Sequence, residues 1–428
     1  MINTNFLILH GGRKMIKSSK CYPRIIPIYG PGVSAEIDRA QTITPTGNLN
    51  REKVNEIGRV GTVGYIVKTP SITYNLSQLE YGNFEFWRKL ANKTDSATTI
   101  TQEDFTTSAF DYVQGLQDDN GTYEGTWLYP NLRTTGFELN ISDPNATVQR
   151  TFNLVGEQAI FLQAAAPYLI SLDMTATDSG DTTIDCSARI PEIDPDASGS
   201  ATDAVKYIYR VVRTRDGIST LLVADTDYTY SNSTHLITLV DVEPDDLFRA
   251  WFTSATAPAS LFTNNDVDVA GLNADVCSIY LYVPASGSPS ADDYLYRLQS
   301  ATITAAFTRE DLKEIGNKDV VQRGIKETKL TVKLGNIMET MKMEEVLRGV
   351  SSTYTRLDVS KFSTDISLIV KVYADNTKET LKYGFKLDGL SPTNFDQSAQ
   401  ANEYMKSSST LEGEEITIST DNAELGNF

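Results

Sequence analysis

The sequence predicts a mainly β protein that contains two copies of one domain with a different segment inserted between them. Short motifs recur at a nearly constant separation, and apolar residues alternate along many short runs that end in turn residues. Composition points the same way, because Thr and Tyr favour pleated, half-buried surfaces and the 428 residues include 21 Tyr.

The repeat rests on four collinear matches. Residues 51–58 (REKVNEIG) and 309–316 (REDLKEIG) are identical at five of eight positions and lie 258 residues apart. The other three matches keep the order and nearly the same separation: 72–76 with 330–334, 119–120 with 375–376, and 154–157 with 411–414. Matches in constant order and spacing indicate a duplicated domain.

Four segments follow from this repeat. They are an N-terminal arm (1–33), a first copy (34–172), an inserted small β-sandwich (173–297) and a second copy (298–428). The arm carries scattered basic residues and three prolines, so we expect it to be disordered or extended across a neighbour. Linkers rich in Pro, Ser, Gly and Asp flank the insert.

Each copy is expected to hold strands and one short helix. In the first copy, alternation predicts strands at 63–76, 123–139 and 149–162. Phe84, Trp87 and Leu90 are spaced as on one helix face, which predicts a core-packed helix over 80–92. In the second copy we expect a helix over 338–348 and strands at 301–307, 326–334, 366–373, 379–387 and 414–419.

The insert is predicted to be an all-β segment. Short strands are predicted at 205–212, 221–230, 236–240, 247–253 and 277–283, separated by turn signals. Strands at this interval are typical of a small sandwich.

Charge and residue content argue against most catalytic and nucleic-acid-binding classes. The net charge of −18 lacks the basic footprint that phosphate binding needs. The chain has two histidines and three well-separated cysteines. These are too few residues to favour a histidine triad, a metal cluster or a disulfide framework. No nucleotide-binding or metalloprotease motif is present, and no stretch is long enough for a membrane span. We therefore expect no enzymatic activity and no cofactor.

Two weaker signals concern metal binding and glycoside hydrolysis. Asp194 and Asp196 resemble the front half of a calcium loop, but Val205 stands where the bidentate Glu belongs, which favours a flexible acidic linker. Among 56 acidic residues, some pair of carboxylates could serve glycoside hydrolysis, although nothing in the sequence selects one pair.

The repeated charged motif is the candidate site. It is either a solvated turn with weak local ion pairs or a set of charged contacts between subunits. Because both copies keep the pattern, we favour a subunit interface formed by Arg51, Glu52, Glu56, Arg309, Glu310 and Glu314.

These elements together resemble a known family. A strand that ends in Arg-Glu-x-x-x-Glu-Ile-Gly, a second long strand, one helix, a hairpin and a closing strand resemble the major tail tube protein of tailed phages. Within the insert, residues 225–230, 237–239 and 248–252 are similar to Ig-like modules of phage structural proteins. The resemblance covers most of residues 34–428 and leaves the arm outside the pattern.

The resemblance implies a structural role in the virion. Six tube domains close into a ring, so three chains with two domains each would form a pseudo-hexameric trimeric ring, and stacked rings would form a tube for DNA ejection. The implied partners are further copies of the chain and other tail proteins (tape measure, terminator and baseplate). Viral DNA would pass without specific binding, no membrane would be involved, and assembly would occur in the host cytoplasm.

Two alternatives stay open. A baseplate or distal tail protein can use the same domain. A secreted β-rich adhesin or glycan-processing enzyme belongs to another class. The shape of the purified protein in electron micrographs distinguishes the three.

Overall fold

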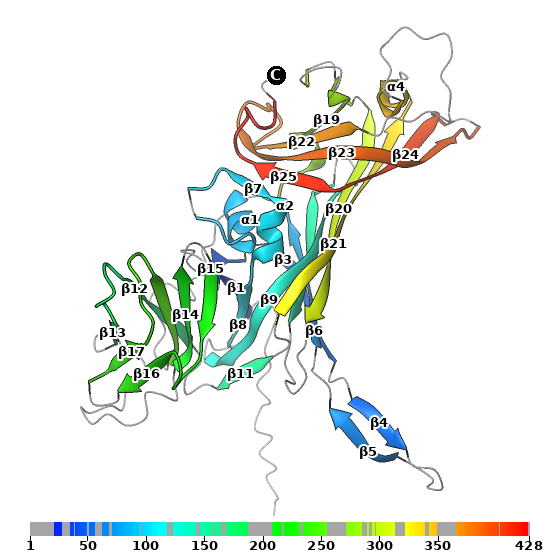
Figure 1. The fold of residues 1–428 in the computed structure, drawn as a ribbon. Coiled ribbons are helices and arrows are strands. Elements are labelled where there is room, and N and C mark those ends of the chain that lie inside the picture. The colour runs from blue at the N-terminus through cyan, green and yellow to red at the C-terminus, as the bar shows by residue number, and fades with distance from the viewer. Residues whose placement is uncertain are drawn as a thin grey trace, which may run out of the picture. The chain divides into compact units, whose positions relative to one another are not determined.

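The computed structural model describes residues 21–27, 35–37, 39–48, 51–55, 62–67, 71–94, 96–117, 123–142, 146–156, 159–163, 168–186, 208–215, 218–231, 234–254, 271–284, 289–290, 293–295, 297–312, 322–338, 342–348, 365–401 and 403–426. The chain divides into two compact units. Unit 1 takes residues 1–24, 112–129 and 159–265, and unit 2 takes 25–111, 130–158 and 266–428. Strands dominate the described residues, which confirms the mainly β class (Figure 1).

Unit 2 is organised around one long antiparallel sheet (Figure 1). Its strands are β3 (Ala40–Asn48), β6 (Ser71–Leu79), β9 (Tyr123–Ile141), β10 (Gln149–Gly156), β19 (Cys277–Tyr282), β20 (Leu298–Leu312), β21 (Gln322–Ile337), β22 (Ile366–Tyr373), β23 (Leu381–Ser398) and β24 (Lys406–Gly413). The order across the sheet is β19-β22-β23-β24-β21-β20-β9-β10-β6-β3. Two shorter strands extend it: β25 (Glu415–Ser419) pairs with β23, and β7 (Thr99–Thr101) pairs with β25.

The strands follow from the alternation in the sequence. In β6 the side chains of Ile72, Tyr74 and Leu76 are buried, while the residues between them are exposed. Leu330 and Leu334 are buried in the same way in β21. One face of each strand therefore enters the core, as a period of two residues requires.

Both copies arrange their strands in the same order. The strands β3, β6, β9 and β10 of the first copy give the sheet order β3-β6-β10-β9. In the second copy, β20, β21, β23 and β24 occur in the equivalent chain order and give the sheet order β20-β21-β24-β23. The outer strands match as well. Strand β9 also pairs with β8 (Phe110–Gln117) and β11 (Ile160–Gln163), just as β23 also pairs with β22 and β25.

The register of pairing is repeated too. Ile43 faces Leu76 in the first copy, and 258 residues later Ala301 faces Leu334. The irregularities recur at counterpart positions, because β3 and β20 both shift register near their first residue, and the ladders β9–β10 and β23–β24 each contain one bulge. The equivalence of the two segments therefore extends to backbone detail.

Helices α1 (Phe84–Leu90) and α4 (Lys342–Leu347) occupy the two predicted helical segments. The side chain of Asn83 caps α1 by accepting hydrogen bonds from the backbone N–H groups of Glu85 (2.8 Å) and Phe86 (3.3 Å). Trp87 and Leu90 are fully buried, so the apolar stripe is core packing, as expected.

A further helix, α2 (Gln102–Thr107), was not expected from the sequence. The backbone N–H of Thr101 donates to the Asp104 carboxylate at 2.8 Å, which is half of a capping box at the start of this helix. Six residues are too few to show a clear helical period, so the sequence pattern did not reveal it. None of the helices in the described part of the chain is long and apolar enough to cross a bilayer.

Unit 1 contains two small sheets. One has the order β12 (Tyr168–Thr175), β18 (Leu247–Ser254), β14 (Ile208–Arg215) and β15 (Ile218–Leu222), and the other has β13 (Thr183–Asp185), β17 (Leu236–Leu239) and β16 (Tyr228–Ser231). Both contribute to one buried cluster that includes Val211, Ile237 and Phe248. Two sheets around one core form a small sandwich.

Three details of the sequence prediction are wrong. The segment 221–230 is two strands in different sheets, because Asp225 takes a left-handed conformation (φ 63°) and turns the chain. Segment 149–162 is also interrupted, giving β11 after β10. Segment 63–76 contains β5 (Thr62–Val67) and most of β6, and residues 68–70 between them lie outside the described ranges. Strand β19, expected to complete the sandwich, pairs instead with β22 in unit 2. A fully buried apolar strand fits either sheet, so its sequence could not choose.

Part of the N-terminal arm is a strand. Residues Cys21–Pro27 form β1, which pairs with β8 and with the two-residue β2 (Ala35–Glu36). The rest of the arm lies outside the described residues. The first five residues of the repeated charged motif in the first copy form β4 (Arg51–Asn55), which pairs antiparallel with β5.

Candidate assembly interface

The two copies join edge to edge inside unit 2. Strand β20, the first strand of the second copy, pairs antiparallel with β9 of the first copy, from Ala301 opposite Ile141 to Ala306 opposite Gly136. A Cβ on Gly136 would lie 2.5 Å from the carbonyl oxygen of Ala305, so this close approach of two backbones requires glycine. The contact is heterologous, because it joins different edges of two equivalent domains.

Arg309 braces this junction. Its guanidinium donates to three carbonyl oxygens of the first copy: Thr134 at 2.8 Å, Thr106 at 3.1 Å and Phe105 at 3.0 Å. Two of the acceptors lie in α2, whose last-turn carbonyls have no partner within the helix. A cation at the C-terminal end of a helix is also favoured by the helix dipole.

A shared aromatic core lies next to this contact. Trp87 of the first copy packs edge-to-face on Phe385 of the second copy, with ring centroids 5.6 Å apart. Phe105 of α2 stacks on Phe307 of β20 at 6.1 Å. Aromatic pairs of this kind add about 0.5–1.5 kcal/mol each beyond their buried area. The copies therefore share one core instead of meeting through a polar boundary.

A buried ion pair completes the junction. Arg150 and Glu80, both fully buried, form a salt bridge of 3.0 Å within the first copy. Tyr383 of the second copy donates its hydroxyl to the same Glu80 carboxylate at 2.5 Å. Burial, and then the neighbouring Glu80 charge, raise the pKa of Tyr383 well above its ordinary value, so the phenol stays protonated and donates.

Four of the six predicted interface residues lie within the described ranges. Arg51 and Glu52 are exposed on β4, Glu310 is exposed on β20, and Glu56 and Glu314 lie outside the described residues. Arg51 and Arg309 are strict counterparts, since Arg51 faces Val67 as Arg309 faces Ile325. A role between subunits stays a prediction for all six.

The surroundings of the two arginines differ. Arg309 is half-buried and bonded to the first copy of its own chain, whereas Arg51 is exposed on β4. The sequence drew attention to Arg309 but not to its acceptors. Backbone carbonyls carry no sequence signal, so Thr134, Thr106 and Phe105 could not have been found beforehand.

Two strand edges of this sheet lack a described partner strand, one along β3 and one along the final part of β23. Among the described strands, β3 pairs with β6 alone, although its counterpart β20 pairs on both sides. For residues 391–398 of β23, the one described partner strand is β24, although the corresponding part of β9 pairs on both sides. These two edges are therefore the counterparts of the two edges that form the internal junction.

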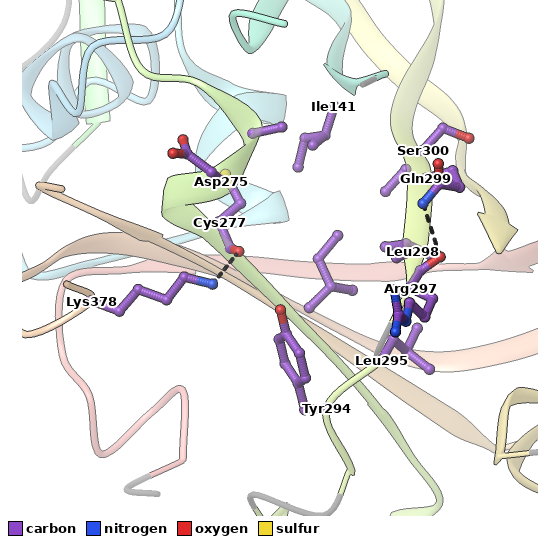
Figure 2. Close-up of a pocket in the computed structure, with 13 residues that line it drawn as sticks. Ile141, Asp275, Cys277, Tyr294, Leu295, Arg297, Leu298, Gln299, Ser300 and Lys378 are labelled. Carbon is purple, nitrogen blue, oxygen red and sulfur yellow. Dashed lines mark hydrogen bonds between the residues drawn. The ribbon is translucent and has the colours of Figure 1, made fainter. Parts of the chain in front are cut away.

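A cavity of about 220 Å³ lies near the junction, lined by Ile141 of β9, by β19 and by the start of β20 (Figure 2). The ammonium group of Lys378 donates to the carbonyl oxygen of Cys277 at 3.1 Å and lies 5.6 Å from the centre of the Tyr294 ring. Burial raises the pKa of the Cys277 thiol to about 12, so it is protonated at neutral pH and is a poor nucleophile. Asp275 is the one carboxylate in the described lining.

The described residues contain no candidate metal site. Within the described ranges, no three His, Cys, Asp or Glu side chains lie close enough together to hold an ion. Asp194 and Asp196 of the acidic linker lie outside those ranges.

Comparison with known proteins assigns this chain to no family. No family model and no curated protein matches the chain. Sixteen chains of solved structures resemble it, among them a chain of the six-fold symmetrised cryo-EM structure of the anti-feeding prophage baseplate. That chain is 14% identical, with a TM-score of 0.25, over 34% of this protein and 93% of the other chain. At this identity and TM-score, the likeness assigns no function.

Proposed function

We propose that this protein is a structural component of a phage-type tail that assembles from copies of itself into rings, and that the rings stack into a tube. The observation that carries the proposal is the internal junction. One chain already joins two equivalent domains edge to edge, and no described strand pairs with the counterpart of either joined edge. A contact of this kind repeats until it closes into a ring or runs on as a filament.

The number of subunits comes from the resemblance to tube proteins. Six tube domains per ring correspond to three chains of this protein. Closure would also remove the exposed strand edges, which otherwise invite aggregation. The shared aromatic core and the hydrogen bond from Tyr383 to the buried Glu80 join the two domains into one building block, which suits a role in assembly instead of catalysis.

A tube of this kind would let DNA pass. A double helix carries about one negative charge per 1.7 Å of its axis, and a chain with a net charge of −18 would repel it. We therefore propose a conduit that neither binds DNA specifically nor inserts into a membrane. Fluorescence anisotropy with labelled duplex DNA at low salt is expected to show no binding to assembled particles, and salt-dependent binding would overturn the conduit.

Electron microscopy of the purified full-length protein tests the proposal, together with the mass in solution from light scattering. We expect rings or tubes, and a smallest closed species with the mass of three 47.2 kDa chains. Rings that never stack would favour a baseplate or distal tail component. Single particles with the mass of one chain at every concentration would overturn self-assembly, and would return the adhesin and glycan-processing classes to consideration.

A further inference from the structure

We infer that neighbouring chains join by an antiparallel ladder between β3 of one chain and β23 of the next, with Thr46 opposite Asp396. This inference rests on the proposed self-assembly and adds the residues and the register of the contact. The partner surface is a second copy of this chain.

The internal junction supplies the register. Each residue of β3 has a counterpart 258 positions later in β20, and the matching ladders within the copies fix the same separation for β9 and β23. Inside the chain, Thr304 of β20 faces Glu138 of β9. Their counterparts are Thr46 and Asp396, and both are exposed.

The backbone of β3 presents the right groups at its open edge. The backbone N–H of Leu79 donates to the carbonyl oxygen of Arg39 at 3.2 Å, and that of Ile337 donates to the carbonyl oxygen of Arg297 at 3.1 Å. Corresponding residues of β6 and β21 therefore direct their backbone groups toward β3 and β20. Backbone groups alternate sides along a strand, so every second residue from Ile43 directs its N–H and C=O groups toward the open edge of β3. Thr46 then falls at a non-hydrogen-bonded position, where paired Cα atoms are about 4.5 Å apart.

Two sequence differences limit the ladder. Pro45 stands where β20 has Ile303 and has no N–H, so this ladder has one hydrogen bond fewer than the internal one. Asn394 stands where β9 has Gly136, whose missing Cβ allows the close approach. The ladder is therefore confined to residues 43–47 of β3 and 395–399 of the partner copy.

Arg51 takes the place of Arg309 in this contact. Arg309 donates to the carbonyl oxygen of Thr134, whose counterpart in the second copy is Pro392. In the assembled protein, Arg51 of one chain would donate to that carbonyl of the next. The predicted interface role of Arg51 thus gains a specific acceptor.

Disulfide trapping tests the register. The variant T46C/D396C is made in a C21S background, while Cys186 and Cys277 are buried and can stay. Non-hydrogen-bonded positions place Cα atoms within the 4.4–6.8 Å range of disulfides. Under mild oxidation, we expect covalent species of two and three chains on a non-reducing gel, which return to one chain on reduction.

Two matched variants control the experiment. T304C/E138C places the same pair at the internal junction and is expected to form an intramolecular disulfide, which shows that the geometry and the oxidation work. T46C/Q397C shifts the pair by one residue, which turns one side chain to the opposite face, and is expected to stay uncrosslinked.

The outcomes separate the two proposals. If wild-type protein forms rings but T46C/D396C stays uncrosslinked, or the shifted pair crosslinks instead, the register is wrong and self-assembly stands. If the wild-type protein has the mass of one chain and no variant crosslinks between chains, both proposals fail.

Discussion

Thr135 and Thr393, 258 residues apart, make the same hydrogen bond at the same irregularity of two different ladders. The hydroxyl of Thr135 donates to the carbonyl oxygen of Asn153 at 3.0 Å, and that of Thr393 donates to the carbonyl oxygen of Thr410 at 3.3 Å. Each Thr is skipped by the register where its ladder bulges. Because the two copies agree in such detail, a residue in one copy can be used to infer the contacts of its counterpart.

The counterparts Arg309 and Arg51 are expected to respond differently to substitution. Arg309→Ala removes three charge-assisted hydrogen bonds from a half-buried position and should lower the free energy of unfolding by about 2 kcal/mol. Arg309→Lys should restore little of it, because an ammonium group lacks the planar fork of the guanidinium. Urea denaturation measures both.

Arg51→Ala is the matched comparison. Because Arg51 is exposed, its loss should change the unfolding free energy by no more than about 0.5 kcal/mol. It should nevertheless raise the protein concentration needed for assembly, whereas Lys53→Ala on the same strand should not. Equal loss of stability for Arg51→Ala and Arg309→Ala would show that Arg51 has a structural role in the single chain.

The hydrogen bond from Tyr383 to Glu80 is expected to stabilise the junction between the two copies. Tyr383→Phe removes one buried hydrogen bond and should cost about 1–2 kcal/mol. Glu80→Gln leaves the buried Arg150 without its counter-charge and should cost about 3–5 kcal/mol. Tyr404→Phe, at a side chain that is 77% exposed, is the control and should be neutral. A neutral Tyr383→Phe would contradict this stabilisation.

Trp127 is expected to become buried on assembly. It is 36% exposed and pairs with exposed Phe161 across β9 and β11, while the counterpart pair Phe385 and Ile418 is buried. Phe385 is covered by Trp87 of the other copy, so a neighbouring chain should cover Trp127. The other two tryptophans are already buried, so a blue shift of the fluorescence and weaker acrylamide quenching on assembly would report this residue. The Trp127→Phe variant should lose the shift.

Acid is expected to weaken the sandwich of unit 1 through Asp246. Hydrogen bonds from Arg215 hold the pKa of the Asp246 carboxyl below its ordinary value, against the opposing effect of burial. A depressed folded-state pKa means that this contribution to stability is present above the unfolded pKa of about 3.9 and is lost as the pH falls below it. Thermal unfolding at pH 7 and at about pH 3 measures the loss.

Asp246→Asn should remove this acid sensitivity and lower the stability at pH 7. Asp245→Asn is the control, because Asp245 is exposed and its left-handed backbone (φ 69°) tolerates Asn. An unchanged pH dependence in Asp246→Asn would assign the acid sensitivity to another carboxylate.

The sequence by itself predicted the duplication, and it determined the mainly β class and much of the local structure. A period of two placed Ile72, Tyr74 and Leu76 on one buried face, and a helical period placed Trp87 in the core. These signals are local, because the spacing of apolar residues along a strand or helix directly sets which face is buried. The constant offset between motifs predicted two equivalent segments, and the strand registers of these segments match.

Only the tertiary structure decided which edges meet. Strand β19 is buried along its whole length and joined the sheet of unit 2, although its pattern suited the sandwich equally well. Arg51 and Arg309 begin nearly the same motif, yet of the two, Arg309 is the one that the described contacts join to a strand and a helix of the other copy. Pairing between distant strands depends on backbone groups that every residue shares, so the sequence marks the strands but not their partners.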